Sequence, residues 1–375
     1  MAVRATLVAL LFVALPLVAP SSAATLPPEP EQWLTDLRFP VNMAWAPDGT
    51  LFYAEKELGN VRTVVDGALL PEPVAHVDVG VSFEMGLLGL AVHPRWPDEP
   101  WLYLYYSDPA DEINRLVRLR VEDDREVERE TLLDGLPTAA AYHNGGDMLF
   151  GPDGLLYLTV GDAHESQRAQ DPADLGGKVL RITPEGGIPD DNPIPGTRTF
   201  TLGHRNSFGL CIDAVTGDVW ETENGPGGGD EVNHLVAGAN YGWPEGTGPL
   251  GDERYTDPFM YFPNTIVPTG CAVWRDHLYV AAYGDGLLRR FAIDGRTSGT
   301  VFGFGQPAFD LAVGPDARLY AATGDTIWRF DAPPRYTAPL DMPPEGGSSG
   351  WVIVSIGVIL AASLIVTLRL AARRR

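Results

Sequence analysis

The stretch Gly145-Gly146-Asp147-Met148-Leu149-Phe150-Gly151-Pro152-Asp153-Gly154 decides the fold, because it is the clearest of six copies of one unit. Each copy begins with an apolar strand, continues through a turn often written Pro-Asp-Gly, and adds further short strands with aromatic residues. Proline presets the first dihedral of such a turn, and Asp and Gly tolerate the next positions. The other copies begin near Val41, Gly86, Phe208, Thr269 and Phe309.

The spacing of these copies favours one architecture. They occupy residues 30–335 at about 50 residues each, which suits a four-stranded blade with some long loops. One such sheet cannot bury both of its faces, whereas six arranged radially can, and ring closure leaves only short edges. We therefore predict an all-β, six-bladed β-propeller. A pair of β-sandwiches is the alternative, which the regular turn spacing disfavours.

The sequence predicts that neither end of the chain belongs to the globular domain. Residues 1–24 have the layout of a secretory signal peptide, with Arg4 before an apolar run and small residues after it. The apolar run 351–368 is just long enough to span a bilayer, and the basic tail 369–375 places its end in the cytoplasm. Residues 336–350, rich in Pro, Gly and Ser, are the predicted flexible tether. A buried core helix and a cleaved sorting tail are the alternatives for 351–368.

Charge and cysteine content exclude some functions. The formal charge is −23, and it becomes −28 without the five arginines of the two end segments. Such acidity repels phosphates, so we expect no nucleic-acid binding, and it indicates solubility or a salty habitat. Cys211 and Cys271 are the only cysteines and form no CxxC pair, which excludes a cysteine zinc site. An exported location permits one disulfide between them, and two buried thiols fit the sequence equally well.

The first polar cluster centres on His143, which lies between Tyr142 and Asn144. A neutral imidazole with a pKa near 6.5 is suited to take a proton from a substrate hydroxyl. Asp162, at the end of the next strand pair, is placed to orient that ring. A histidine whose hydrogen bonds are satisfied in a turn is the alternative. Because His143 and Arg205 each precede the first strand of a blade, we expect both at the same channel mouth.

The second polar cluster joins residues 203–206 to residues 223–231. Arg205 is suited to planar contacts with a carboxylate or carbonyl, and an inter-blade salt bridge is the alternative. The glycine-rich loop 225–229 is not a phosphate loop, since no Lys-Ser or Lys-Thr follows it. It can offer backbone carbonyls to a cation, with carboxylates from Asp230 and Glu231, and calcium accepts such oxygens. A solvated acidic turn is the alternative.

Taken together, the motifs resemble a known family. The chain resembles the soluble glucose/sorbosone dehydrogenases, also called aldose sugar dehydrogenases, which are six-bladed propellers that use pyrroloquinoline quinone (PQQ). The matching motifs are spread over nearly the whole predicted propeller, residues 30–335. It includes residues 52–56, 59–62, Gly86-Leu87-Leu88-Gly89-Leu90-Ala91-Val92-His93-Pro94, His143-Asn144-Gly145-Gly146, 161–162, 170–171, 177–182, 191–193, Gly203-His204-Arg205-Asn206, 225–226, 229–231 and 240–244.

This resemblance implies roles for the residues of the first site. His143 matches the family's catalytic histidine, which takes the proton of the sugar's anomeric hydroxyl, and Asp162 matches the aspartate that orients it. Arg205 and Asn206 match residues that bind PQQ, and Asn224 is placed with them. The arginine would stabilise charge that develops on the quinone oxygen, an electrostatic role often worth about 10²–10³ in rate.

The resemblance also implies calcium. The carbonyls of Gly225 and Pro226 match ligands of the calcium that holds PQQ. Glu231 and the main chain of Tyr241 match a second, structural calcium site. We therefore expect an exported, membrane-tethered propeller that oxidises an aldose or a related hydroxyl compound and passes the electrons to a respiratory or soluble acceptor.

Three positions depart from the family pattern. The family commonly has Pro-Gln where this chain has Ser207-Phe208, a Lys near Gly284, and an Arg where this chain has Phe309. The loss of two cations would weaken binding of the tricarboxylate by about 1.5–3 kcal/mol per charge-assisted hydrogen bond. Some relatives, such as hedgehog-interacting proteins, keep the scaffold for partner binding. A non-catalytic binding propeller that has lost PQQ is therefore the alternative function.

Overall fold

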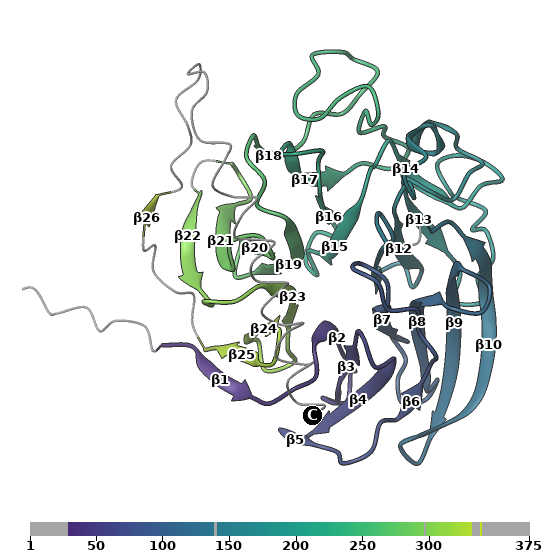
Figure 1. Ribbon diagram of the computed structural model, residues 1–375, viewed down its shortest axis with the longest axis vertical. Helices are drawn as coiled ribbons and strands as arrows, with labels where there is room; N and C mark the ends of the chain where they lie inside the picture. The colour runs from purple at the N-terminus through teal and green to yellow at the C-terminus, as the bar shows by residue number, and fades with distance from the viewer. Residues whose placement is uncertain (1–28, 139–140, 296–297, 332–337, 340–375) are drawn as a thin grey trace, which may run out of the picture. The chain divides into compact units, whose positions relative to one another are not determined.

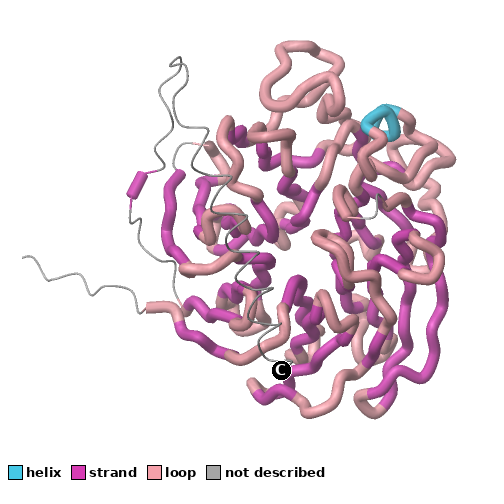
Figure 2. Tube along the Cα trace, viewed as in Figure 1, coloured by secondary structure: helices cyan, strands magenta, loops and turns pink. Residues whose placement is uncertain are grey.

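Six β-sheets lie radially around a central channel in the computed structural model, which describes residues 29–138, 141–295, 298–331 and 338–339 (Figure 1). The one 3-10 helix of the described residues is η1 (Ser166–Gln170), and strands make up the rest of their regular structure (Figure 2). The propeller belongs to a compact unit that ends at Thr337. A second unit, 338–375, contains the two-residue strand β26 (Ala338–Pro339).

Each blade is one antiparallel sheet. Blade 1 contains β2 (Pro40–Trp45), β3 (Leu51–Glu55), β4 (Asn60–Val65), β5 (Ala68–Leu69) and β6 (Ala75–His76). Blade 2 contains β7 (Leu87–Val92), β8 (Trp101–Asp108), β9 (Ile113–Glu122) and β10 (Arg125–Leu136). Blade 3 contains β11 (Gly145–Phe150), β12 (Leu156–Val160), β13 (Lys178–Ile182) and β14 (Thr199–Leu202).

The remaining blades complete the ring. Blade 4 contains β15 (Ser207–Ile212), β16 (Val219–Glu223), β17 (Asp230–Leu235) and β18 (Met260–Phe262). Blade 5 contains β19 (Pro268–Trp274), β20 (His277–Ala282), β21 (Leu287–Ala292) and β22 (Ser298–Gly303). Blade 6 contains β23 (Ala308–Val313), β24 (Leu319–Thr323), β25 (Ile327–Phe330) and β1 (Glu31–Leu34).

The predicted six-bladed architecture is confirmed, and the pair of sandwiches is wrong. The innermost strands β2, β7, β11, β15, β19 and β23 each begin within one residue of a predicted repeat start, and each contacts the next around the ring. All six also shift register near their first residues where they pair with the second strand of the blade. A shared bulge at one place indicates that the six blades are copies of one structural unit.

The ring is closed by a strand from the other end of the chain. β1 pairs with β25 and so becomes the outermost strand of blade 6. No pattern in the sequence predicted this pairing. It covers an edge of the last blade that would otherwise expose unpaired backbone groups.

The turns between the first two strands form at the predicted Pro-Asp-Gly positions, and hydrogen bonds to the aspartate carboxylates stabilise them. The carboxylates of Asp48, Asp153 and Asp316 each accept a hydrogen bond from the backbone N–H two residues later, at 3.0, 3.1 and 3.2 Å. The glycine that follows Asp153, Gly154, has φ of +74°, which a residue without Cβ adopts at little cost.

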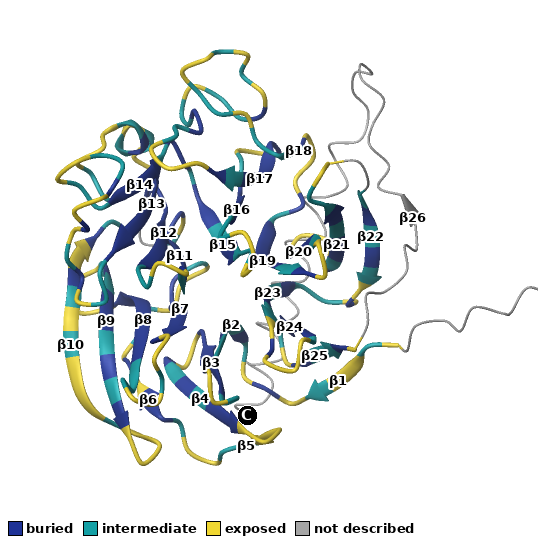
Figure 3. Ribbon diagram, turned by 180° about the vertical axis from the view of Figure 1, so that it is seen from behind, coloured by how far each residue is buried: buried dark blue, intermediate teal, exposed yellow. Residues whose placement is uncertain are grey.

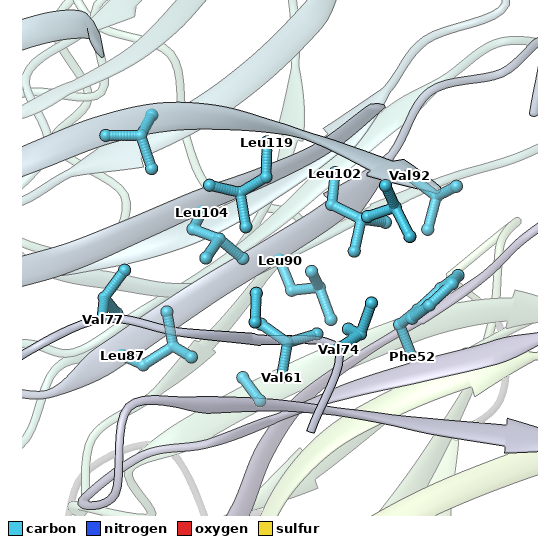
Figure 4. Close-up of a cluster of buried hydrophobic side chains, with 14 of the residues drawn as sticks. Phe52, Val61, Val74, Val77, Leu87, Leu90, Val92, Leu102, Leu104 and Leu119 are labelled. Atoms are coloured by element: carbon cyan, nitrogen blue, oxygen red, sulfur yellow. The ribbon is translucent and has the colours of Figure 1, made fainter. Parts of the chain in front are cut away.

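Apolar side chains of neighbouring blades pack face to face and form the core. Between blades 1 and 2, Phe52 and Val61 meet Leu87, Leu90 and Leu104 (Figure 4). The middle strands β3, β12, β16 and β24 are buried along their whole length. The outer strand β10 is largely exposed (Figure 3), and its charged residues protect a free edge.

Cys211 and Cys271 form a disulfide, with Cα atoms 5.5 Å apart. It joins the innermost strands β15 and β19 and lies in the wall of the channel. Of the two alternatives open from the sequence, the structure has the disulfide and not the two thiols.

The predicted signal peptide, tether, membrane span and basic tail lie outside the described residues, apart from Ala338 and Pro339 within the tether. Within the described part of the chain, no helix is long and apolar enough to cross a membrane.

Candidate active site

The site lies at the end of the channel where the innermost strands begin. His143 comes just before β11, and Arg205 just before β15, 62 residues later. Two backbone hydrogen bonds bring their segments together through the turn after β12. Asp162 N donates to Arg205 O at 2.9 Å, and Ala163 N donates to His143 O at 3.3 Å. The repeat phase, which requires both segments at one channel mouth, explains this contact.

His143 is paired with Asp162 and is only 5% exposed. Its Nδ1 lies 2.6 Å from Asp162 Oδ1, so the proton of the neutral ring is held on Nδ1. Nε2 then carries a lone pair and has no hydrogen-bond partner among the described residues. Such a nitrogen can accept a proton from a bound hydroxyl.

Asp162 accepts two further hydrogen bonds that fix its position. His164 N donates to Oδ1 and Trp243 Nε1 donates to Oδ2, both at 2.8 Å. Burial alone would raise the pKa of Asp162, but the hydrogen bonds from His143, Trp243 and His164 outweigh burial and hold it below its ordinary value. The carboxylate is therefore ionised at neutral pH and stabilises positive charge on the imidazole.

Arg205 is half-buried beside this pair. Nη1 donates to Asn224 O at 2.7 Å and to Gly225 O at 3.3 Å, and the guanidinium lies 5.5 Å from the Trp243 ring. Burial lowers the pKa of Arg205, and the nearby Asp162 and Glu223 carboxylates oppose that shift. Nε and Nη2 have no partner among the described residues. A charged guanidinium therefore presents a free edge to an anionic or carbonyl ligand.

Glu84, which is not among the predicted site residues, links two segments of the site. Its Oε2 accepts from His143 N at 2.6 Å and from Asn206 Nδ2 at 3.2 Å. Burial raises the pKa of Glu84, while these hydrogen bonds lower it. The residue stands two positions before the quoted Gly86 motif. An acidic residue in the turn just before an apolar strand was the available signal.

Asn206 and Asn224 are held within the protein. Asn206 is 2% exposed, and its Oδ1 accepts from Gly145 N at 3.2 Å. Asn224 Nδ2 donates to Pro268 O at 3.1 Å and so links blades 4 and 5. Both side chains therefore position the backbone around His143 and Arg205.

Known proteins share this architecture. The Glucose / Sorbosone dehydrogenase profile matches residues 37–330. The chain belongs to the glucose/sorbosone dehydrogenase family. Aldose sugar dehydrogenase YliI of Escherichia coli is 27% identical, over 84% of this chain and 96% of its own. Quinoprotein glucose dehydrogenase B of Acinetobacter calcoaceticus is 31% identical, over 59% of this chain and 53% of its own.

Solved structures agree with this assignment. A putative oxidoreductase (glucose dehydrogenase) from Thermus thermophilus is 38% identical with a TM-score of 0.76, and the match covers 80% of this chain and 99% of that chain. The PQQ-bound form of an aldose sugar dehydrogenase from Streptomyces coelicolor is 28% identical with a TM-score of 0.73, and the match covers 79% of this chain and 95% of that chain. The family predicted from the motifs is confirmed.

Packing at the mouth explains two of the three positions at which this chain departs from the family pattern. A Cβ on Gly284 would lie 2.6 Å from Ile266 O, so no side chain fits there without a backbone shift. The Phe309 ring packs edge-on against Phe39 at 4.8 Å and against Tyr283 at 5.7 Å. An aromatic cluster thus occupies the part of the mouth where the family pattern has cations. No packing contact among the described residues explains the third departure, at the half-buried Phe208.

The loop before β17 is shaped by Asp230. Its Oδ1 accepts from Gly225 N at 2.9 Å, and its Oδ2 accepts from Ile266 N and Val267 N at 2.7 and 2.8 Å. The carboxylate therefore fixes the loop that carries the carbonyls of Gly225 and Pro226. The predicted role of Asp230 as a cation ligand is not what this geometry favours.

A set of buried carboxyls lies behind this loop. Glu231 accepts a hydrogen bond from Gly248 N, and burial raises its pKa to about 8. The Tyr241 ring stacks on His204 with centroids 4.9 Å apart. The ligand atoms that lie within 4.8 Å of one another belong to His204, Glu221 and Glu223. Among the described residues, that set contains neither Glu231 nor Tyr241.

Proposed function

We propose that this protein is a PQQ- and calcium-dependent dehydrogenase that oxidises the anomeric hydroxyl of an aldose, with His143 as the general base. The observation that carries the proposal is the 2.6 Å contact of His143 Nδ1 with an ionised, buried Asp162, which leaves Nε2 as a proton acceptor. The family assignment and the PQQ-bound Streptomyces coelicolor relative supply the reaction class.

The residues at the mouth fit such a cofactor. Arg205 offers two unpaired nitrogens to a carboxylate or a quinone oxygen, and the carbonyls of Gly225 and Pro226 are oxygen ligands of the kind that calcium takes. The aromatic rings of Phe309 and Tyr283 offer apolar surface to a planar ring system. PQQ supplies a two-electron acceptor when bound, and the protein supplies proton transfer and charge stabilisation.

Each protein group then has one task. His143 Nε2 takes the hydroxyl proton, and Asp162 stabilises the imidazolium that forms. Arg205 would hold the acceptor, and its preorganised hydrogen-bond donors Nε and Nη2 would stabilise negative charge there. Glu84, Asn206 and Asn224 hold these groups in place. Glu231 and the Tyr241 carbonyl are proposed as ligands of a second, structural calcium.

The cellular setting is part of the same proposal. We infer export through residues 1–24 and tethering outside the cytoplasm through residues 351–368. The Cys211–Cys271 disulfide supports export, because disulfides persist mainly in oxidising compartments.

The test is calorimetry of the purified full-length protein with PQQ in calcium buffer, followed by dye reduction with D-glucose and other aldoses. We expect saturable heat and sugar-dependent reduction. His143→Ala should abolish reduction while the heat of PQQ binding and the melting temperature change little. No heat at high micromolar PQQ would remove the enzyme and leave a binding propeller.

A further inference from the structure

An exposed row of rings leads from the catalytic pair to the surface. His143 and His164 stack with centroids 4.0 Å apart and planes at 21°. His164 meets Tyr142 edge-on at 5.6 Å, and Tyr142 meets Phe83 at 4.8 Å. Phe83 is 66% exposed and Tyr142 is 43% exposed. We call Phe83, Tyr142 and His164 the aromatic row.

Exposed aromatic residues are concentrated at this mouth. Among the described residues, the Phe, Tyr and Trp side chains classed as exposed are those of Phe83, Tyr142 and Tyr283. Tyr283 belongs to the aromatic cluster with Phe309 and Phe39, and Lys56 Nζ lies 5.5 Å from the Phe39 ring. Exposed apolar surface gathered beside one site is typical of a binding surface.

The backbone conformation of three loops, and not burial of the rings, positions the aromatic row. Phe83, His143, Ala163 and His164 have φ of 44°, 57°, 50° and 59°. Non-glycine residues rarely adopt this left-handed region, and such strain collects at functional sites. Four such residues lie in the three loops that carry these rings.

Buried polar groups anchor the loop that carries Phe83. Lys56 Nζ donates to Phe83 O and to Met85 O, both at 2.8 Å. Glu84 N donates to Ala141 O at 3.0 Å, and the Glu84 carboxylate accepts from His143 N. The loop of Phe83 and the loop of Tyr142 are therefore fixed to each other, and the two rings keep their spacing without a ligand.

The chemistry of the row fits a sugar chain. A pyranose ring has an apolar face of C–H groups and a rim of hydroxyls, and the negative face of an aromatic ring attracts such C–H groups. The His164 ring nitrogens have no hydrogen-bond partner among the described residues, so they are open to sugar hydroxyls. The three spacings, 4.0 to 5.6 Å, place successive rings in continuous contact from His143 outward.

We infer that the aromatic row is a saccharide subsite that binds the sugar units next to the one oxidised at His143, so that the preferred substrate is an oligosaccharide with a free reducing end. This rests on the proposed function, since His143 marks the reducing end. A second class of occupant, a protein electron acceptor docked on the same rings, is an outcome of the test.

The test is calorimetric titration of the full-length protein, loaded with PQQ and calcium, with D-glucose, maltotetraose and cellotetraose. We expect at least one tetraose to bind about tenfold more tightly than glucose, because stacking of a further ring is worth roughly that factor. In Phe83→Ala and Tyr142→Ala, the ratio of tetraose affinity to glucose affinity should fall toward one. Tyr142→Phe keeps the ring and should keep the gain, and Val215→Ala, at a 93% exposed apolar side chain, is the matched surface control.

The outcomes separate the two proposals. Equal affinities of glucose and both tetraoses for the unmodified protein, or a gain that survives Phe83→Ala and Tyr142→Ala, would overturn the saccharide subsite. A protein-docking surface predicts equal affinities of glucose and both tetraoses. If the affinities are equal and the protein reduces dye with glucose, the proposed dehydrogenase reaction is retained without the saccharide subsite. If dye reduction is absent but the ring-dependent gain is present, the aromatic row binds a saccharide and the proposed reaction fails.

Discussion

Replacing Asp162 by Asn tests the hydrogen-bonded arrangement on which the proposed chemistry depends. Asp162 Oδ1 accepts from His143 Nδ1 at 2.6 Å and from His164 N at 2.8 Å. Oδ2 accepts from Trp243 Nε1 at 2.8 Å. Asparagine has the same shape, but it offers one oxygen and one NH₂ group to these three donors.

Either orientation of the new amide is costly. With its oxygen toward His143, its NH₂ group faces the Trp243 N–H, and that indole loses its acceptor. With its oxygen toward Trp243, the NH₂ group faces His143 Nδ1 and the N–H of His164. His143 must then carry its proton on Nε2, where it cannot act as a base.

The expected magnitudes follow from these losses. One unsatisfied buried donor costs about 1–3 kcal/mol of unfolding free energy. The wrong tautomer and the loss of imidazolium stabilisation should lower kcat by about 10²–10⁴. The pKa of Asp162 is depressed in the folded protein, so its contribution to stability is present above its ordinary pKa near 3.9. It is lost as the pH falls through the lower folded value, so the variant's deficit should be constant near neutrality and narrow only in acid.

The assay pairs dye-reduction kinetics with urea unfolding, and the chain offers a matched control. The exposed Asp48 also accepts from an indole, Trp96 Nε1 at 2.8 Å, and from a backbone N–H, but no histidine of the described residues is hydrogen-bonded to it. Asp48→Asn should cost stability without a comparable loss of kcat. A fall in kcat of less than tenfold in folded Asp162→Asn would refute the orientation argument.

Three further predictions concern stability. Replacing Cys211 and Cys271 by Ser opens a loop of 60 residues and should cost about 4 kcal/mol in guanidinium unfolding on the chain-entropy scale; a loss under about 1 kcal/mol would contradict it. Burial raises the pKa of Glu221 to about 8, so its folded state binds an extra proton between pH 5 and 8, and stability from this group falls as the pH rises through that window. Glu221→Gln should therefore change the melting temperature little at pH 5.5 but raise it at pH 9. The gain in unfolding free energy at pH 9 should be about 1.4 kcal/mol for each pH unit that separates the folded pKa of Glu221 from its unfolded pKa. An equal change in melting temperature at both pH values would count against this. Gly284→Ala places a Cβ 2.6 Å from Ile266 O and should cost about 1–3 kcal/mol, which an unchanged melting temperature would disprove.

The fold was predictable because its signals are local. The Pro-Asp-Gly turns form by hydrogen bonds between residues two apart, as at Asp153, and each apolar strand start recurs with the blade. Ring closure was not predictable in the same way. The pairing of β1 with β25 joins segments nearly 300 residues apart, and nothing in residues 31–34 specifies that partner over any other free edge. The disulfide was left open for the same reason, since pairing depends on the distance between two strands of different blades.

The site was predictable in part. The residues that the motifs contain, His143, Asp162 and Arg205, meet at the mouth because repeat phase places them there. Glu84 was missed because its role comes from contacts 59 and 122 residues away, with His143 and Asn206, and not from its neighbours in sequence. The aromatic row was missed because Phe83, Tyr142 and His164 stand in three different loops.

Buried charged side chains fix the loops at the mouth of the channel, and this has a consequence for the reaction. Lys56, Glu84 and Arg205 are each tied by hydrogen bonds to backbone atoms of a neighbouring segment. Asp162 is tied to the backbone of its own turn and to the side chains of His143 and Trp243. Holding charges in this way costs desolvation energy, which an apolar mouth would not require. In return the loops are fixed before a ligand arrives, and the dipoles need not reorganise when charge moves. Substitutions at these four residues should therefore reduce kcat by more than their effect on unfolding free energy accounts for, whereas substitutions in the interblade core, such as Leu104→Ala, should reduce stability and leave the kcat of the folded fraction unchanged.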